Sequence, residues 1–202
     1  MSAAKEVGIK DILYTSQGHK EINLSRIEFI LSSHLATESA IKASGMNYTI
    51  LRNGLYMDML PLFLGDDIFK YGIYLPAGKG KICFALRSEM AETAAKILIS
   101  NKHRNKTYNL SGDSYSFSEI AEYISEITGK NITYLSPSLD AFLNTMIYQG
   151  MSKKCAEMIG GLAEATRQGE LECDSMPMEK LLGRKPLTVK QYLEEIFVWN
   201  FF

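Results

Sequence analysis

Cysteine is scarce in this sequence, and long apolar runs are absent. Its 202 residues contain three cysteines, Cys83, Cys155 and Cys173, an odd number without C-x-x-C spacing. That pattern argues against a disulfide framework and against a zinc knuckle. No stretch approaches the roughly 20 apolar residues that cross a bilayer, and the first residues do not form a signal peptide. We therefore expect a cytoplasmic protein without a membrane segment.

An excess of either charge is also missing. Lys and Arg number 22 and Asp and Glu 23, which gives a net charge of −1. Because no basic field gathers phosphates, we expect no nucleic-acid partner. The sequence has no H-E-x-x-H, no carboxylate cluster with metal-ligand spacing and no serine nucleophile elbow. We accordingly predict no metal site and assign no catalytic residue.

A glycine-rich phosphate turn is the third absence. Dinucleotide-binding folds hold the pyrophosphate on G-x-G-x-x-G, because only glycine lets backbone N–H groups approach the phosphates closely. None of the 15 glycines recreates that spacing. Gly78-Lys79-Gly80 comes nearest, but the strand-like Lys81-Ile82-Cys83-Phe84 follows it, so we expect a simple turn.

Apolar periodicity predicts alternating strands and helices. Strands are expected at 9–14, 48–51, 82–86, 107–110 and 132–135. Helices are expected at 25–44, 90–98 and 117–128, the last with a Ser116–Glu119 capping box and a stop at Gly129. Gly8 is expected to end a preceding helical turn, and Thr188 to cap a final helix. Such alternation is typical of an α/β fold in which helices cover a parallel sheet.

Polar residues follow two successive predicted strands. Tyr14-Thr15-Ser16 ends one strand and Arg52-Asn53-Gly54 ends the next. The carboxyl ends of parallel strands share one edge, which is where ligands bind in this architecture. The alternative is that Thr, Ser, Asn and Gly are simply common in turns.

Two ionisable residues lie on the apolar stripe of the helix predicted at 25–44. His34 and Glu38 recur at three- and four-residue steps with Ile27, Leu31 and Ile41, so they point inward. Either they hydrogen-bond to each other in a half-buried position, or they lie beside a ligand. The sequence leaves both interpretations open. His19 and His103 stand in polar loops, where we expect them to be solvated.

Several segments resemble the NmrA-like atypical short-chain dehydrogenases, in particular their branch of quinone and triphenylmethane-dye reductases. The resemblance lies in residues 3–16, 34–38 and 44–56, and further in 78–82, Arg87 and 108–113. It implies a Rossmann-like parallel sheet that binds NADP(H) and transfers hydride to a small quinone-like substrate. It also implies cofactor contacts at Tyr14, Thr15, Ser16, His34, Asn53, Gly54, Leu55 and Tyr56, with Tyr56 and Arg87 facing the substrate. Ile30 and His34 occupy the positions of the usual Tyr-x-x-x-Lys pair, so a tyrosine general acid is not predicted.

The resemblance also suggests a division of the chain. Residues 1–111 would form a truncated Rossmann-like part with a loop-rich excursion at 53–86, and residues 112–202 a mainly helical substrate lobe. Met146, Met151 and Met158 would give that lobe a pliable wall, or else fill its core. We expect the terminal Trp199, Phe201 and Phe202 to pack on the core.

Only the later part of the family's sequence is matched, and the glycine-rich turn has no counterpart. We therefore expect NADP(H) binding to be weak or absent in this chain alone. The alternatives are a non-catalytic NmrA-like binding or redox-regulatory module, or a truncated gene product. The first strand would lack a neighbour on one side, so we expect the chain to be poorly stable alone, to form a homodimer through that edge, or to need another polypeptide.

Overall fold

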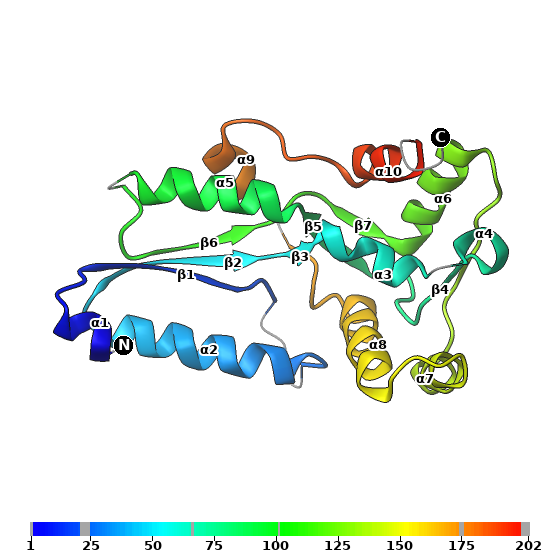
Figure 1. Cartoon of the computed structure of the whole chain (residues 1–202), viewed down its shortest axis with the longest axis horizontal. Coiled ribbons are helices and arrows are strands. Elements are labelled where there is room, and N and C mark those ends of the chain that lie inside the picture. Colours follow the sequence, from blue (N-terminus) through cyan, green and yellow to red (C-terminus); the bar gives the residue numbers. More distant parts are fainter. Residues whose placement is uncertain (1, 21–24, 66, 101, 174–175, 199–202) are drawn as a thin grey trace.

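The first layer of the fold is a parallel sheet. The computed structural model describes residues 2–20, 25–65, 67–100, 102–173 and 176–198. β1 (Asp11–Gln17), β2 (Asn47–Asn53) and β6 (Lys106–Leu110) pair in parallel in the order β1-β2-β6. Helix α2 (Glu28–Ala43) runs along one side of this sheet and α5 (Arg87–Leu98) along the other (Figure 1). The predicted α/β class is confirmed.

Shorter strands continue the β structure beyond this sheet. β5 (Lys81–Ala85) pairs in parallel with β3 (Leu55–Tyr56) and antiparallel with β7 (Ser114–Ser116). β4 (Ile73–Tyr74) pairs in parallel with β8 (Tyr134–Leu135). The region expected to be a loop-rich excursion therefore holds several short elements.

Helices make up most of the rest of the chain. They are α1 (Ser2–Glu6), the 3-10 turn η1 (Met57–Met59), α3 (Leu60–Leu64), α4 (Ile68–Tyr71), α6 (Phe117–Thr128), α7 (Leu139–Tyr148), α8 (Lys153–Arg167), α9 (Met176–Leu182) and α10 (Val189–Val198). The predicted capping box of α6 is present: the Ser116 hydroxyl accepts the Glu119 N–H, and the Glu119 carboxylate accepts the Ser116 N–H at 2.7 Å. Gly129 ends the helix in the left-handed conformation, also as predicted. Thr188 accepts the Gln191 N–H and so caps α10.

The buried core draws on both ends of the sequence. Its largest fully buried side chains include Phe84 from β5, Phe117 from α6 and Phe142 from α7. A second cluster lies between β6, α5 and α9 and includes Leu110, Met90 and Met178. The division of the chain at residue 111 stays a prediction.

Two strands begin two residues later than predicted, and the bounds of the other three differ by one or two residues. Ile9 is not part of β1, because its N–H closes the end of α1 by donating to the Ala4 carbonyl, next to Gly8 at a φ of 77°. This helix-ending motif delays the strand to Asp11. Ile132 also lies outside β8; its N–H donates to the Ser125 hydroxyl at 2.9 Å while its side chain packs in the core.

Within the described residues, β1 pairs only with β2, and its other edge carries no strand. The terminal aromatic residues at 199, 201 and 202, expected to pack on the core, lie outside the described part of the chain. Among the residues that the structure describes, no helix is both long and apolar enough to span a bilayer.

Candidate functional site

The strand ends that the sequence singled out meet at one edge of the sheet. Ser16 is in register with Arg52 and Gln17 with Asn53, and Asn53 is in register with Leu110 of β6. The backbone continues this alignment beyond the strands, since Gly54 N–H donates to the Leu110 carbonyl at 2.8 Å. Three parallel strands thus end side by side, at the edge where α/β folds bind ligands.

A buried carboxylate lies behind this edge. Glu38 of α2 accepts the Ser16 hydroxyl at 2.7 Å and two guanidinium N–H groups of Arg52 at 2.9 and 2.8 Å. Lys42 adds a contact at 3.6 Å. Burial by itself raises the pKa of Glu38, but the hydrogen bonds from Arg52 and Ser16 and the neighbouring positive charges lower it to about 2. Glu38 is therefore an ionised anchor that joins α2 to β1 and β2.

His34 has a different partner from the one the sequence suggested. Its Nδ1 lies 2.8 Å from the Tyr14 hydroxyl, and the two rings are tilted at a centroid distance of 5.9 Å. The predicted His34–Glu38 hydrogen bond is wrong. Tyr14 of β1 is the partner of His34, and Arg52 of β2 binds Glu38. The inward orientation of both residues is confirmed by their place in the interface between α2 and the sheet.

The other two histidines are not simply solvated, which corrects the prediction. His103 Nδ1 lies 2.9 Å from the Tyr108 hydroxyl, and His19 Nδ1 lies 3.0 Å from the Gln17 carbonyl. Both are half-buried. The loops that carry them fold back onto their own strands.

Two buried side-chain oxygens at the sheet edge have no hydrogen-bond partner among the residues that the structure describes. They are Asn53 Oδ1 at the end of β2 and Ser111 Oγ, which directly follows β6. Gly54 lies between them: a Cβ there would meet the Ser111 Cβ at 2.9 Å and the Cys83 carbonyl at 3.1 Å. Sequence reasoning did not select Ser111, although its place just after a predicted parallel strand was a usable signal. Buried polar groups are nearly always paired, so unpaired ones on adjacent strand ends point to a ligand site.

The remaining predicted residues lie on both sides of this edge. Thr15 is exposed and, because strand side chains alternate, points away from the face of Tyr14 and Ser16. Leu55 and Tyr56 form β3, in register with Phe84 and Ala85 of β5.

Tyr56 and Arg87, which the resemblance places on the substrate side, lie together. The Arg87 guanidinium stands over the Tyr56 ring at 5.6 Å from its centroid. Asp58 contacts Arg87 in two ways: its carboxylate lies 3.6 Å from Arg87 Nε and accepts the Arg87 backbone N–H at 3.0 Å. Arg87 is 61% exposed, so its charge remains available to a ligand.

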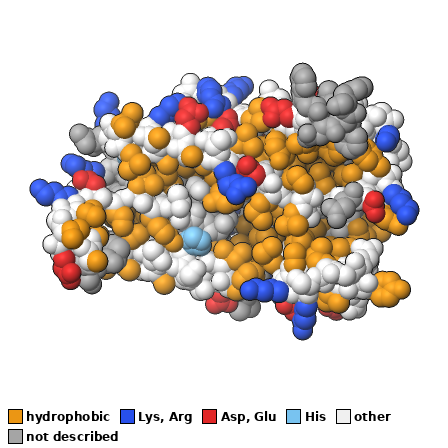
Figure 2. All heavy atoms as spheres, in the orientation of Figure 1, with side chains coloured by type: hydrophobic (Ala, Val, Ile, Leu, Met, Phe, Trp, Pro, Cys, Tyr) orange, Lys and Arg blue, Asp and Glu red, His pale blue; other side chains and the backbone are white. Residues whose placement is uncertain are grey.

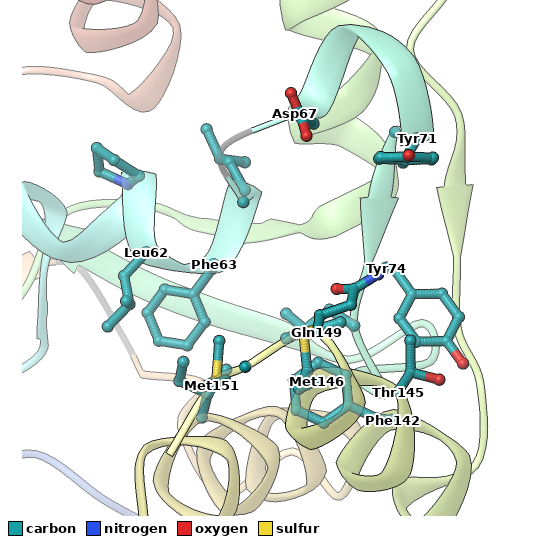
Figure 3. Close-up of a pocket in the computed structure, with 17 residues that line it drawn as sticks. Leu62, Phe63, Asp67, Tyr71, Tyr74, Phe142, Thr145, Met146, Gln149 and Met151 are labelled. Atoms are coloured by element: carbon teal, nitrogen blue, oxygen red, sulfur yellow. The ribbon is translucent and has the colours of Figure 1, made fainter.

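A pocket lies in the helical part of the chain. It has a volume of about 830 Å³ between α3, α4, α7 and α8. Phe63, Tyr74, Phe142, Met146 and Met151 point into it, with Thr145 and Gln149 as polar groups (Figure 3). Hydrophobic side chains also gather on the half of the visible face that carries α3, α6 and α10 (Figure 2). Met158, by contrast, packs against the core.

The model of the NmrA-like family matches residues 1–193. The chain belongs to this family. It is 30% identical over 202 residues to quinone oxidoreductase 2 of Escherichia coli (strain K12), an alignment that covers 99% of this chain and 69% of that protein. This family member therefore spans about two thirds of the length of its relative.

Solved NmrA-like structures agree in fold. An NADPH-dependent quinone oxidoreductase from Escherichia coli, in complex with NADPH, superposes with a TM-score of 0.84 at 29% identity, covering 97% of this chain and 69% of the other. Triphenylmethane reductase from Citrobacter sp., in complex with NADP(H), superposes with a TM-score of 0.85 at 31% identity, covering 96% and 68%. The predicted membership and Rossmann-type fold are confirmed.

Proposed function

We propose that this chain is the nicotinamide- and substrate-binding part of an NADP(H)-dependent reductase of small quinone-like or dye molecules. The observation that carries the proposal is the pair of unpaired buried atoms, Asn53 Oδ1 and Ser111 Oγ, at the carboxyl edge of the sheet. The names of the two relatives solved with NADPH or NADP(H) support the choice of ligand.

The residues present fit one end of the cofactor. Asn53 offers an acceptor oxygen and Ser111 a hydroxyl, and Gly54 lets β2 pack closely against Ser111 and the Cys83 carbonyl. When bound, NADP(H) supplies a hydride. The residues that we propose to hold it are Tyr14, Thr15, Ser16, His34, Asn53, Gly54, Leu55 and Tyr56. Among them, Ser16 and His34 act through their buried bonds to Glu38 and Tyr14.

The sequence contains no glycine-rich turn of the kind that binds the diphosphate end of the cofactor. Gly78 and Gly80 form a turn against α8, where a Cβ on Gly80 would overlap the Thr166 carbonyl oxygen. The phosphates would therefore lack the backbone N–H groups that a glycine-rich turn provides. We infer that this chain on its own binds NADP(H) weakly, and that its affinity comes from the nicotinamide end.

The substrate side is assigned to Tyr56 and Arg87. An exposed guanidinium beside an aromatic ring suits a quinone, because the ring stacks while the cation stabilises negative charge that develops on the quinone oxygen. The hydride acceptor also needs a proton, for which we assign no side chain.

Calorimetric titration of the 202-residue chain with NADPH and with reduced nicotinamide mononucleotide tests the proposal. Because only the nicotinamide end is held, the two dissociation constants should agree within a few-fold. Asn53→Ala should weaken both about tenfold, the equivalent of about 1.4 kcal/mol. Lys153→Ala, an exposed change on α8, is the control. Absence of any binding by the mononucleotide would contradict the proposal, as would binding that Asn53→Ala leaves unchanged.

Turnover is the second measurement. A fully substituted quinone, which does not alkylate thiols, is mixed with the chain and NADPH, and loss of NADPH absorbance is followed. The alternative function is a non-catalytic binding or redox-regulatory module, favoured by the absence of the glycine-rich turn and of the Tyr-x-x-x-Lys pair from these residues. Nicotinamide binding without quinone reduction would favour this module.

We also propose a homodimer formed through β1. Its outer edge carries no strand in the described structure, and unpaired strand edges recruit partners. Sedimentation across a range of concentrations tests this, and a monomer at all concentrations would contradict it.

A further inference from the structure

Two cysteines far apart in the sequence touch in the fold. Cys83 lies on β5, and Cys173 lies 90 residues later in the segment after α8. The Cys83 sulfur accepts the Cys173 backbone N–H at 2.9 Å, and the Cys83 thiol lies 3.3 Å from the Cys173 carbonyl oxygen. Because an N–Cα bond measures about 1.46 Å, the Cys173 Cα lies within about 4.4 Å of this sulfur. That spacing is compatible with a disulfide after rotation of the side chains.

The segment 168–173, here called the strap, connects two parts of the fold. On one side its Leu171 carbonyl accepts the Cys83 N–H at 3.3 Å. On the other side, its Glu170 carbonyl accepts the Lys20 N–H at 2.9 Å, and the Glu170 carboxylate accepts the Ser25 hydroxyl at 2.6 Å. The strap thus ties β5 to the loop between β1 and α2.

The strap lies close to the candidate site. The Cys83 carbonyl lies beside Gly54, where an added Cβ would meet it at 3.1 Å. The loop that binds Glu170 follows the carboxyl end of β1. A covalent bond between Cys83 and Cys173 would therefore fix a loop beside the ligand-binding edge. In reducing cells such bonds are mostly transient and regulatory.

We propose that Cys83 and Cys173 form a reversible disulfide that fastens the strap to β5. The oxidant is a small disulfide such as oxidised glutathione. The half-buried Cys173 attacks it first, forming a mixed disulfide and releasing one glutathione thiol. Cys83 then attacks the Cys173 sulfur and releases the second glutathione thiol. Two protein thiols are oxidised and one glutathione disulfide is reduced to two thiols, so electrons and protons balance.

The order of these steps follows from the surroundings of the two sulfurs. Cys83 is fully buried, whereas Cys173 is half-buried, so only Cys173 is open to the oxidant. Contact with the Cys173 side chain and burial raise the pKa of the Cys83 thiol. Cys83 is therefore a poor first nucleophile and acts in the second step, inside the fold.

Peptide mapping tests the proposal directly. The reduced chain is treated with oxidised glutathione, remaining thiols are blocked with a maleimide, and the protein is digested with trypsin. Each cysteine falls in its own tryptic peptide, namely 82–87, 155–167 and 168–180. The expected product links 82–87 to 168–180, while 155–167 carries the maleimide.

The unfolded chain provides a matched control. In denaturant Cys173 should pair with the much nearer Cys155, since loop closure favours the shorter loop roughly tenfold. Cys155→Ser should leave the linkage in the folded chain unchanged. Cys83→Ser, checked for folding by circular dichroism, should keep glutathione on Cys173.

Three results would overturn the proposal: three free thiols after oxidation, glutathione that persists on Cys173 of the wild-type chain, or a dominant link to Cys155 in the folded chain. Each would show that the fold does not direct these two thiols together. The linkage is read from peptides alone, so it can be established even if no nicotinamide compound binds.

Discussion

Glu38 and Arg52 form a two-point ion pair that joins helix α2 to strand β2. Their atoms approach to 2.9 and 2.8 Å, and the Glu38 side chain is only 3% exposed. The pair lies directly behind the carboxyl edge of the sheet, since Arg52 precedes Asn53. It therefore fixes the helix that presents His34 and the strand that presents Asn53.

Removal of this carboxylate should be costly. Glu38→Gln removes the buried negative charge that Arg52 binds at two points, and we expect the free energy of unfolding to fall by about 3 kcal/mol. Glu28→Gln, an exposed change on the same helix, should cost less than about 1 kcal/mol. Urea denaturation measures both. Equal midpoints for the two variants would show that the ion pair gives no net stabilisation.

The same pair predicts acid sensitivity. The pKa of Glu38 is about 2 in the folded chain and about 4.5 in its ordinary state. A lowered carboxyl pKa stabilises the fold above pH 4.5, and this contribution is lost as the pH falls towards 2. Linkage gives it a size of roughly 3 kcal/mol. Denaturation of the wild type and Glu38→Gln between pH 7 and pH 2 should show the difference in stability shrinking, and a constant difference would contradict it.

Two glycines should respond in opposite ways to alanine. At Gly80 a Cβ would overlap the Thr166 carbonyl oxygen, so Gly80→Ala should cost more than about 2 kcal/mol. At Gly161, inside α8, the nearest atom would be 3.6 Å away. Gly161→Ala should therefore stabilise the chain by about 0.5 to 1 kcal/mol through helix propensity. Thermal denaturation distinguishes them, and a Gly80→Ala chain as stable as the wild type would refute the close packing of this turn on α8.

The Tyr14–His34 contact gives a smaller prediction. Tyr14→Phe keeps the ring but removes the hydroxyl that lies 2.8 Å from His34, and we expect a loss of about 0.5 to 1.5 kcal/mol. Tyr148→Phe is the control, because Tyr148 is 93% exposed. If both variants match the wild type in urea denaturation, the hydrogen bond contributes nothing to stability.

Local signals in the sequence predicted most of the elements. The capping box at Ser116 and the left-handed Gly129 depend only on residues within one or two helical turns. The sequence was therefore sufficient to predict both. The inward stripe of α2 was equally visible from its periodicity. The shifted start of β1 also had a local cause, the helix-ending bond of Ile9, but apolar character alone did not reveal it.

The partners of the site residues could not be predicted in the same way. Glu38 binds Arg52 rather than His34, because the register of β1 and β2 decides which side chains face α2. Cys83 and Cys173 are separated by 90 residues, and no sequence spacing signals their contact. That Ser111 lies next to Asn53 becomes evident only when β6 is placed beside β2. The site residues are therefore brought together by the pairing of strands that are distant in the sequence.

Arg87 and Asp58 should separate substrate binding from stability. Asp58 accepts the first N–H of α5, so Asp58→Ala should lower the free energy of unfolding by about 1 kcal/mol. The Arg87 side chain is mostly exposed, and Arg87→Ala should change stability by less than about 0.5 kcal/mol.

Under the proposed function, however, Arg87→Ala should weaken binding of a fully substituted quinone about tenfold, while Arg87→Lys should retain part of the affinity because it keeps the charge. Calorimetry with the quinone measures this. Unchanged affinity in Arg87→Ala would show that the Arg87 side chain does not contribute to quinone binding.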